Sequence, residues 1–270
     1  MRFFSKIINI YKILIKKNYS TLSGAIAFFL IINGGSIAYL LLFVSNLLEI
    51  DLPISNQYVL SFLNTIERNV DSRSYLYTIF FVFTSIYGAS SLFFHLLKTG
   101  EMIYEETNGK FTIVKRLTAI IFLAAVIFIV EICFVVLVLS KNVLSNIFLK
   151  IIRYILFALI PLVIVICINF FITPHEVKVK DILKGSIVTT VSWYILTFAF
   201  TTYVRVFTNY KAIYGVLTLF IIFMIWLYLI AQGLVVGIII NEKTKTVNLI
   251  LKGNANNIVG TPEEEVYEKN

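Results

Sequence analysis

The stretch Leu117–Leu139, LTAIIFLAAVIFIVEICFVVLVL, decides the fold class of this 270-residue chain. It contains one charged residue, Glu131, and neither glycine nor proline. A helix rises about 1.5 Å per residue, so a helix of this length crosses the ~30 Å hydrocarbon core of a bilayer. A soluble helix of the same length would carry a charged face, and this stretch has none. It therefore predicts a membrane-spanning helix.

Further apolar stretches of similar length occur on both sides of it. They are Gly24–Leu48, Tyr75–Leu97, Ile152–Thr173, Ser186–Phe207 and Ile213–Ile240. The composition agrees, because 59% of the residues are apolar and only 14% are charged, against about 25% charged residues in soluble domains. The mean hydropathy is +0.90. We therefore expect an all-α fold, a polytopic bundle of six transmembrane helices.

The segments between the apolar stretches are too short to form a hydrophobic core of their own. We expect residues 1–22 to form a cytoplasmic, amphipathic and basic segment, and residues 23–243 to form the transmembrane domain. Residues 244–270 are expected to be a disordered cytoplasmic tail, because they include the acidic run Glu263–Glu265.

The net charge of +8 reflects membrane topology. With a cytoplasmic amino terminus and six spans, cytoplasmic segments hold 16 Lys and Arg residues and outer segments hold 7. This partition satisfies the positive-inside rule, although the short basic loop 140–152 falls outside. We expect both termini to be cytoplasmic, and the charge distribution argues against a nucleic-acid partner.

Two amphipathic helices are predicted outside the spans. In residues 3–17, Phe3, Ile7, Ile10 and Leu14 share one helical face while the lysines lie largely away from it. This pattern is typical of a helix lying on an anionic inner leaflet, although a basic flank that merely fixes the orientation would look similar. Apolar residues at four-residue spacing also predict a short outer cap helix over Ser55–Val70.

Glu131 is the first candidate functional residue. It lies about nine residues, or ~13 Å, from the outer end of its span, where a charge costs roughly 2.5–3.5 kcal/mol. We expect either a charged pair with Arg205 or Arg153, or a neutral acid bonded to a hydroxyl of the span Ser186–Phe207. Two roles are open for Glu131: a substrate or proton site, and a structural ion pair.

A polar seam and a small-residue motif mark the last two spans. Ser186, Thr190, Thr197 and Thr201 fall on one helical face, so we expect them, together with Asn169 of the preceding span, to face the bundle interior. The seam either lines a polar cavity or serves helix packing. Gly233-x-x-x-Gly237 predicts close helix packing, either within the bundle or between two copies in a homo-oligomer.

The sequence offers no recognisable catalytic machinery. The two histidines, His95 and His175, lie near the ends of different spans with no neighbouring ligand cluster. A catalytic metal needs three or more converging ligands, and neither a P-loop nor a G-x-S-x-G motif is present. We expect a protein that is not an enzyme and that needs no metal or cofactor.

The carboxyl-terminal half resembles a known family. A succession of short elements resembles that of the YihY/BrkB family in the same order: Thr173-Pro174, Asp181–Gly185, Trp193, Tyr203, Tyr214-Gly215, Trp226–Tyr228 and Gly233–Asn241. The stretches Gly24–Phe29 and Tyr87–Tyr104 are similar to earlier elements of that family. The chain departs from the family where the first span has Asn33–Ser36 in the region of a usual proline. It departs again at Ile239, which replaces a usual acid.

The resemblance implies a six-span protein of the bacterial inner membrane. Members of this family were once labelled ribonuclease BN, an assignment since attributed to a different, soluble enzyme, and some are called virulence factors linked to serum resistance. The resemblance implies no defined activity. From the residues we expect transport or handling of a lipid or small amphipathic substrate, with a membrane scaffold for envelope integrity as the alternative and a membrane-embedded enzyme ranked below both.

Overall fold

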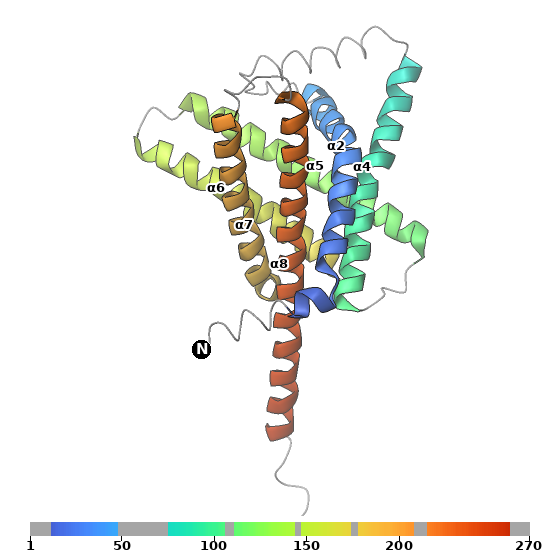
Figure 1. Cartoon of the computed structure of the whole chain (residues 1–270), viewed down its shortest axis with the longest axis vertical. Coiled ribbons are helices and arrows are strands. Elements are labelled where there is room, and N and C mark those ends of the chain that lie inside the picture. The colour runs from blue at the N-terminus through green and yellow to red at the C-terminus, as the bar shows by residue number, and fades with distance from the viewer. Residues whose placement is uncertain are drawn as a thin grey trace, which may run out of the picture.

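The computed structural model describes residues 12–47, 75–105, 111–143, 147–173, 178–207 and 215–259. Within these ranges the chain forms long helices joined by short connections (Figure 1). The helices are α2 (Tyr19–Leu47), α4 (Tyr75–Tyr104), α5 (Thr112–Val143), α6 (Ile147–Ile172), α7 (Val179–Phe207) and α8 (Gly215–Val259).

The expected all-α membrane bundle is confirmed. Among the described residues, five helices contain a stretch long and apolar enough to cross a membrane, namely α2, α4, α5, α7 and α8. We expected six such spans. The remaining one corresponds to α6, which is 26 residues long and whose described apolar stretch is the shorter Leu159–Ile172.

The predicted segments outside the spans have different outcomes. Residues 12–16 are helical, and a turn at Lys17–Asn18, with Asn18 at a φ of 51°, separates them from α2. Residues 3–11 and the predicted cap helix Ser55–Val70 lie outside the described residues. Where we expected a disordered tail from residue 244, α8 continues to Val259 and extends beyond the bundle (Figure 1). Val247, Ile250 and Leu251 keep a helical spacing of apolar residues there.

The apolar core lies among α2, α4, α5, α6 and α8 and includes the buried Ile26, Phe93, Ile103, Ile172 and Val235. Glycines set the closest helix contacts. A Cβ at Gly100 of α4 would collide with the Ile172 carbonyl of α6, and one at Gly185 of α7 would collide with the Gly237 carbonyl of α8. Such close backbone approach is a common basis of helix packing in membranes.

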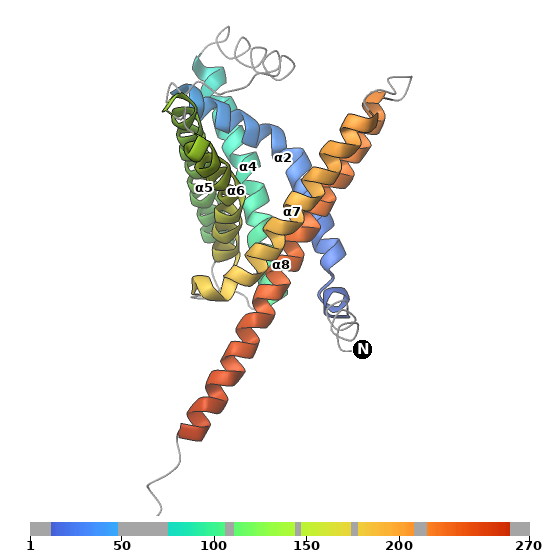
Figure 2. The same ribbon diagram turned by 90° about the vertical axis from the view of Figure 1, so that its left-hand side faces the viewer.

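The helices separate into two arms. Figure 2 shows the α7–α8 pair diverging from α5 and α6, with the arms closest near the beginning of α7. The burial of α7 follows this geometry. Ser186 and Thr190, near its beginning, are buried, whereas Ile195 and Phe198, further along, are 64% and 75% exposed. The second half of α7 therefore contacts α8 on one side and leaves its other side uncovered.

Candidate functional site

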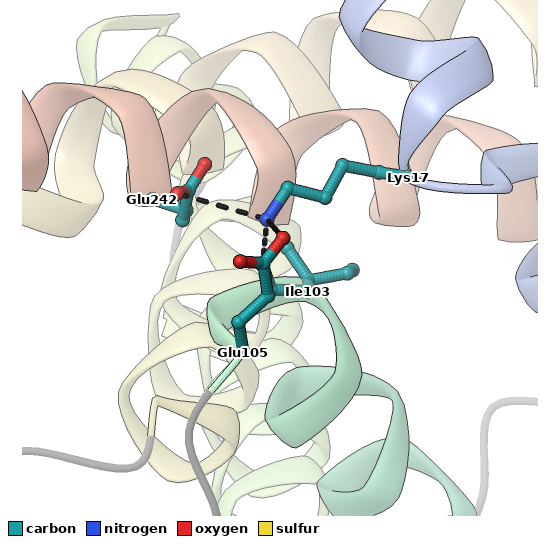
Figure 3. A network of polar contacts seen from close by, with 4 residues as sticks. All are labelled: Lys17, Ile103, Glu105 and Glu242. Atoms are coloured by element: carbon teal, nitrogen blue, oxygen red, sulfur yellow. Dashed lines mark hydrogen bonds and ion pairs between the residues drawn. The ribbon is translucent and has the colours of Figure 1, made fainter.

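Lys17 joins the turn before α2 to α4 and α8 at one end of the bundle (Figure 3). The Lys17 Nζ donates to the carbonyl oxygen of Ile103 at 2.6 Å and to Oε1 of Glu105 at 2.8 Å, and it lies 3.9 Å from Oε1 of Glu242. The Ile103 carbonyl belongs to the last turn of α4, where a cation satisfies an orphan acceptor and complements the helix dipole. Lys17 therefore connects the turn before α2 to the end of α4 and to Glu242, which lies within α8.

The carboxylate of Glu105 responds to this contact. The hydrogen bond from Lys17, and then its positive charge, lower the pKa of Glu105 below its ordinary value of 4.5. Glu105 also adopts a φ of 55°, just past the end of α4. Because its side chain is exposed, the pair contributes little to stability by itself, and the buried end of Lys17 matters more.

A polar contact holds α7 against α8. The Oδ1 of Asn241, which is 1% exposed, accepts a hydrogen bond from the backbone N–H of Gly185 at 2.7 Å. The Oγ1 of Thr189 donates to the Gly233 carbonyl at 3.2 Å, and the Trp193 indole N–H donates to the Ile230 carbonyl at 2.9 Å. These three bonds run along one interface and make α7 and α8 a rigid pair.

Asn169 and Ser186, two of the predicted interior polar residues, lie together. The Nδ2 of Asn169 donates to the Ser186 Oγ at 2.9 Å, and that hydroxyl donates to the Ile182 carbonyl at 2.8 Å. Both residues are at most 2% exposed. Their contact joins α6 to α7 at the point where the two arms meet.

The structure gives Glu131 a partner that we did not predict. Glu131 is 2% exposed, and the Ser45 hydroxyl of α2 lies 3.1 and 3.0 Å from its two carboxylate oxygens. The predicted contacts with Arg205 and with a hydroxyl of α7 are wrong, because the second half of α7 belongs to the other arm and Arg205 is exposed. The side chain of Arg153 lies outside the described residues.

The predicted polar seam of α7 divides at the same place. Ser186 and Thr190 are buried, but Thr197 and Thr201 are exposed, so the expectation that all four face the interior is wrong for the outer two. The Thr201 hydroxyl donates to the Thr197 carbonyl at 2.8 Å, and the Thr190 hydroxyl donates to the Ser186 carbonyl at 2.8 Å. Bonds within the helix make an exposed hydroxyl tolerable in lipid.

Gly233 and Gly237 lie at the α7–α8 interface of the same chain. A Cβ at Gly233 would approach the Ser192 hydroxyl to 2.9 Å, and one at Gly237 would collide with Thr189. The motif predicted close packing either within the bundle or between two copies of the chain. The structure places both glycines against α7 of the same bundle. The sequence did not predict five of the residues that take part in the contacts above. They are Lys17, Ser45, Gly185, Thr189 and Asn241. Of these, Gly185 and Asn241 already belonged to the stretches that carry the family resemblance.

An apolar groove lies between α5 and α6. Its volume is about 430 Å³, and α5 contributes Phe122, Ala125 and Ile129 to its wall. The rest of the lining comes from α6 and from the first residue of α7: Ile166, Cys167, Phe170, Phe171 and Val179. Phe122 and Phe171 stack with their ring centroids 3.7 Å apart and form a rigid part of the wall. Phe170 and Val179 are each 54% exposed, which leaves the groove open at its edge.

Metal chemistry has no support in the described part of the chain. Within those ranges, no three His, Cys, Asp or Glu side chains lie together in a way that could hold a metal ion. The groove lining contains one sulfur atom, the Cys167 thiol, and otherwise only hydrocarbon side chains.

The helices and their composition define a polytopic helical membrane protein. Residues 10–254 match the Virulence factor BrkB family, and the chain belongs to that family.

Two curated relatives resemble parts of it. A UPF0761 membrane protein of Coxiella burnetii (strain Dugway 5J108-111) is 34% identical over 74 residues, which is 27% of each chain. The putative ribonuclease-like protein YfkH of Bacillus subtilis (strain 168) is 31% identical over 96 residues, which is 34% of this chain and 35% of the relative. These matches therefore span only about a quarter to a third of each relative. No solved structure matches the chain.

Proposed function

We propose that this protein handles a lipid or a small amphipathic molecule in the bacterial cytoplasmic membrane, without catalysis and without a cofactor. The observation that carries the proposal is the apolar groove of about 430 Å³ between α5 and α6. Its size falls within the 300–1,000 Å³ typical of ligand sites. Because it opens at the side of membrane-spanning helices, a hydrocarbon chain is the molecule in immediate contact with it.

The lining of the groove selects among substrate classes. An ion or a polar solute would need charged or carbonyl groups to replace its hydration shell, and the groove offers only apolar side chains and one thiol. An acyl chain makes no such demand. Val179, which lines the groove, stands between the exposed Lys178 and Lys180. Those two cations are complementary to an anionic headgroup, so the proposed substrate has an apolar chain and a negatively charged head.

The orientation and the partners form part of the same proposal. Both termini are proposed to be cytoplasmic, with the amino-terminal helix on the anionic inner leaflet. The contact of Lys17 with Glu242 supports this topology, since it brings the beginning of α2 and the inner part of α8 to one end of the bundle. The partition of 16 against 7 basic residues supports it as well. The proposed partners are membrane lipids and a second copy of the chain, and nucleic acid is not among them.

Photo-crosslinking tests the proposal. The full chain is reconstituted with phosphatidylglycerol that carries a diazirine in its acyl chain, and labelled peptides are mapped. Saturable labelling of α5 and α6 is expected for the unaltered protein. Ala125→Trp fills the groove and should reduce this labelling to background, whereas Ala124→Trp, on the exposed face of the same helix, should leave it unchanged.

A membrane scaffold is the second candidate function. The continuation of α8 beyond the bundle favours it, because that extension presents a surface to soluble partners (Figure 1). Labelling of α5 and α6 that neither saturates nor responds to Ala125→Trp would overturn lipid handling and leave the scaffold as the better account.

A further inference from the structure

Two cations gather around one aromatic ring on the outward face of α4 and α5. The Nζ of Lys98 lies 4.8 Å from the centroid of the Phe94 ring, and the Cζ of Arg116 lies 5.5 Å from the same centroid. The two charges are therefore within about 10 Å of each other, the Debye length at 0.1 M salt. Both charges therefore contribute to the electrostatic potential beside this ring.

Arg116 is held in a fixed orientation with donors to spare. Its Nη2 donates to the Tyr87 carbonyl at 3.1 Å, and its guanidinium lies 4.2 Å from the Tyr87 ring centroid. A guanidinium has five N–H donors in a planar fork that matches a phosphate. One hydrogen bond to a carbonyl and one stacked face leave the rest of that fork available.

The site carries a net positive charge. Glu101 lies beside it but pairs with Lys115, whose Nζ is 2.8 Å from Oε1. An anion is the electrostatic complement of these two cations.

The surroundings indicate where that anion comes from. Tyr87 is 68% exposed, and Phe111 and Leu117, which flank Arg116 in sequence, are 83% and 56% exposed. In a membrane protein these exposed aromatic and apolar side chains face lipid. Lys98 lies six residues before the end of α4, or about 9 Å along the helix. Basic pockets between helices on the cytoplasmic side are a known means of binding anionic headgroups.

We propose that Lys98 and Arg116 form a binding site for the phosphate of an anionic phospholipid on the α4–α5 face. Arg116 binds two phosphate oxygens through its planar fork, and Lys98 adds a point charge from the neighbouring helix. The site shares no residue with the α5–α6 groove. It stands whether or not that groove holds a substrate.

Native mass spectrometry of the full chain in detergent, titrated with phosphatidylglycerol or phosphatidylcholine, tests the site. In an Ala125→Trp background, in which the groove is filled, the double variant Lys98→Gln/Arg116→Gln should bind phosphatidylglycerol about ten- to thirtyfold more weakly, since each cation near an anionic headgroup contributes a few-fold in affinity. Phosphatidylcholine binding should not change. Lys184→Gln/Lys243→Gln removes the same charge from two exposed positions elsewhere and should stay within about twofold of the unaltered protein.

Further arms decide the remaining questions. Arg116→Lys keeps the charge but loses the fork, and it should retain only part of the phosphatidylglycerol affinity. Lys98→Gln alone, at an exposed position, gives the same test if the double variant does not fold. An equal loss in the two double variants would mean unspecific surface attraction and would overturn the site. Displacement of phosphatidylglycerol by millimolar inorganic phosphate would overturn the assignment to a lipid.

Discussion

Gly185→Ala should weaken the contact that makes α7 and α8 one unit. A Cβ at this position would collide with the Gly237 carbonyl and with Oδ1 of Asn241, and it would lie 2.6 Å from Cγ of Asn241. Carbon atoms pack at about 3.5–4.0 Å, so the two helices would have to move apart by about 1 Å. The obstacle is partly backbone, which cannot rotate away as a flexible side chain can.

The magnitude follows from three contributions. Overpacking of this kind costs about 1–3 kcal/mol, and loss of the bond from Gly185 N–H to Asn241 costs about 1 kcal/mol. Replacing glycine by alanine inside a helix returns about 1 kcal/mol. The net expectation is a free energy of unfolding lowered by about 1–3 kcal/mol. The measurement is denaturation of the full chain in mild detergent, followed by the fluorescence of the chain's two tryptophans, Trp193 and Trp226.

Gly34→Ala is the matched control. Gly34 lies inside α2, and a Cβ there would meet nothing within 4 Å. Only the helix-propensity gain should remain, so this variant should be unchanged or more stable by up to about 1 kcal/mol. If the two variants had the same stability, the close α7–α8 contact would not exist in the folded protein, and the reasoning would be refuted.

Two further contacts make testable predictions. Ser45→Ala should lower the free energy of unfolding by about 1–3 kcal/mol, because it leaves the buried Glu131 carboxyl without the hydroxyl that bonds it. A double-mutant cycle should show a smaller loss when the same substitution is made in a Glu131→Gln background. If the two costs simply added, the pair would not be coupled. Lys17→Met should cost about 1–2 kcal/mol through the lost cap of α4, while Lys16→Met, at an exposed position, should be nearly neutral in the same thermal-denaturation assay. The pKa of Glu105 is lowered on folding, so the stability that its carboxylate gains from Lys17 is present above about pH 4.5 and is lost as the pH falls through the folded-state pKa. The difference in thermal stability between Lys17→Met and the unaltered protein should therefore narrow only in acid.

The sequence predicts the spans well because hydrophobic length is a local property. Leu117–Leu139 contains the apolar part of α5, and the helix extends beyond it at both ends. The close approach of Gly237 to a neighbouring helix also follows from residue size alone. The partners of buried polar groups do not follow in this way. Glu131 contacts Ser45 because α2 lies against α5 there, and no spacing along the chain reveals which helices are neighbours.

The second half of α7 shows the same limit. Ser186, Thr190, Thr197 and Thr201 share one helical face, yet only the first two are buried. The difference arises from the divergence of the two arms (Figure 2), which is a property of the assembled bundle. Likewise, the groove combines residues of three helices, and its apolar side chains look like ordinary span residues in the sequence.

A structure of the full chain in lipid nanodiscs tests the proposed lipid handling most directly. The account predicts elongated density, continuous with a headgroup near Lys178 and Lys180, that lies in the α5–α6 groove along Ala125 and Cys167. The structure of the Ala125→Trp variant in the same nanodiscs should lack that density and keep the helices in place. A groove closed by the side chains of Phe170 and Val179, with the surrounding lipid no more ordered there than elsewhere, would contradict the account.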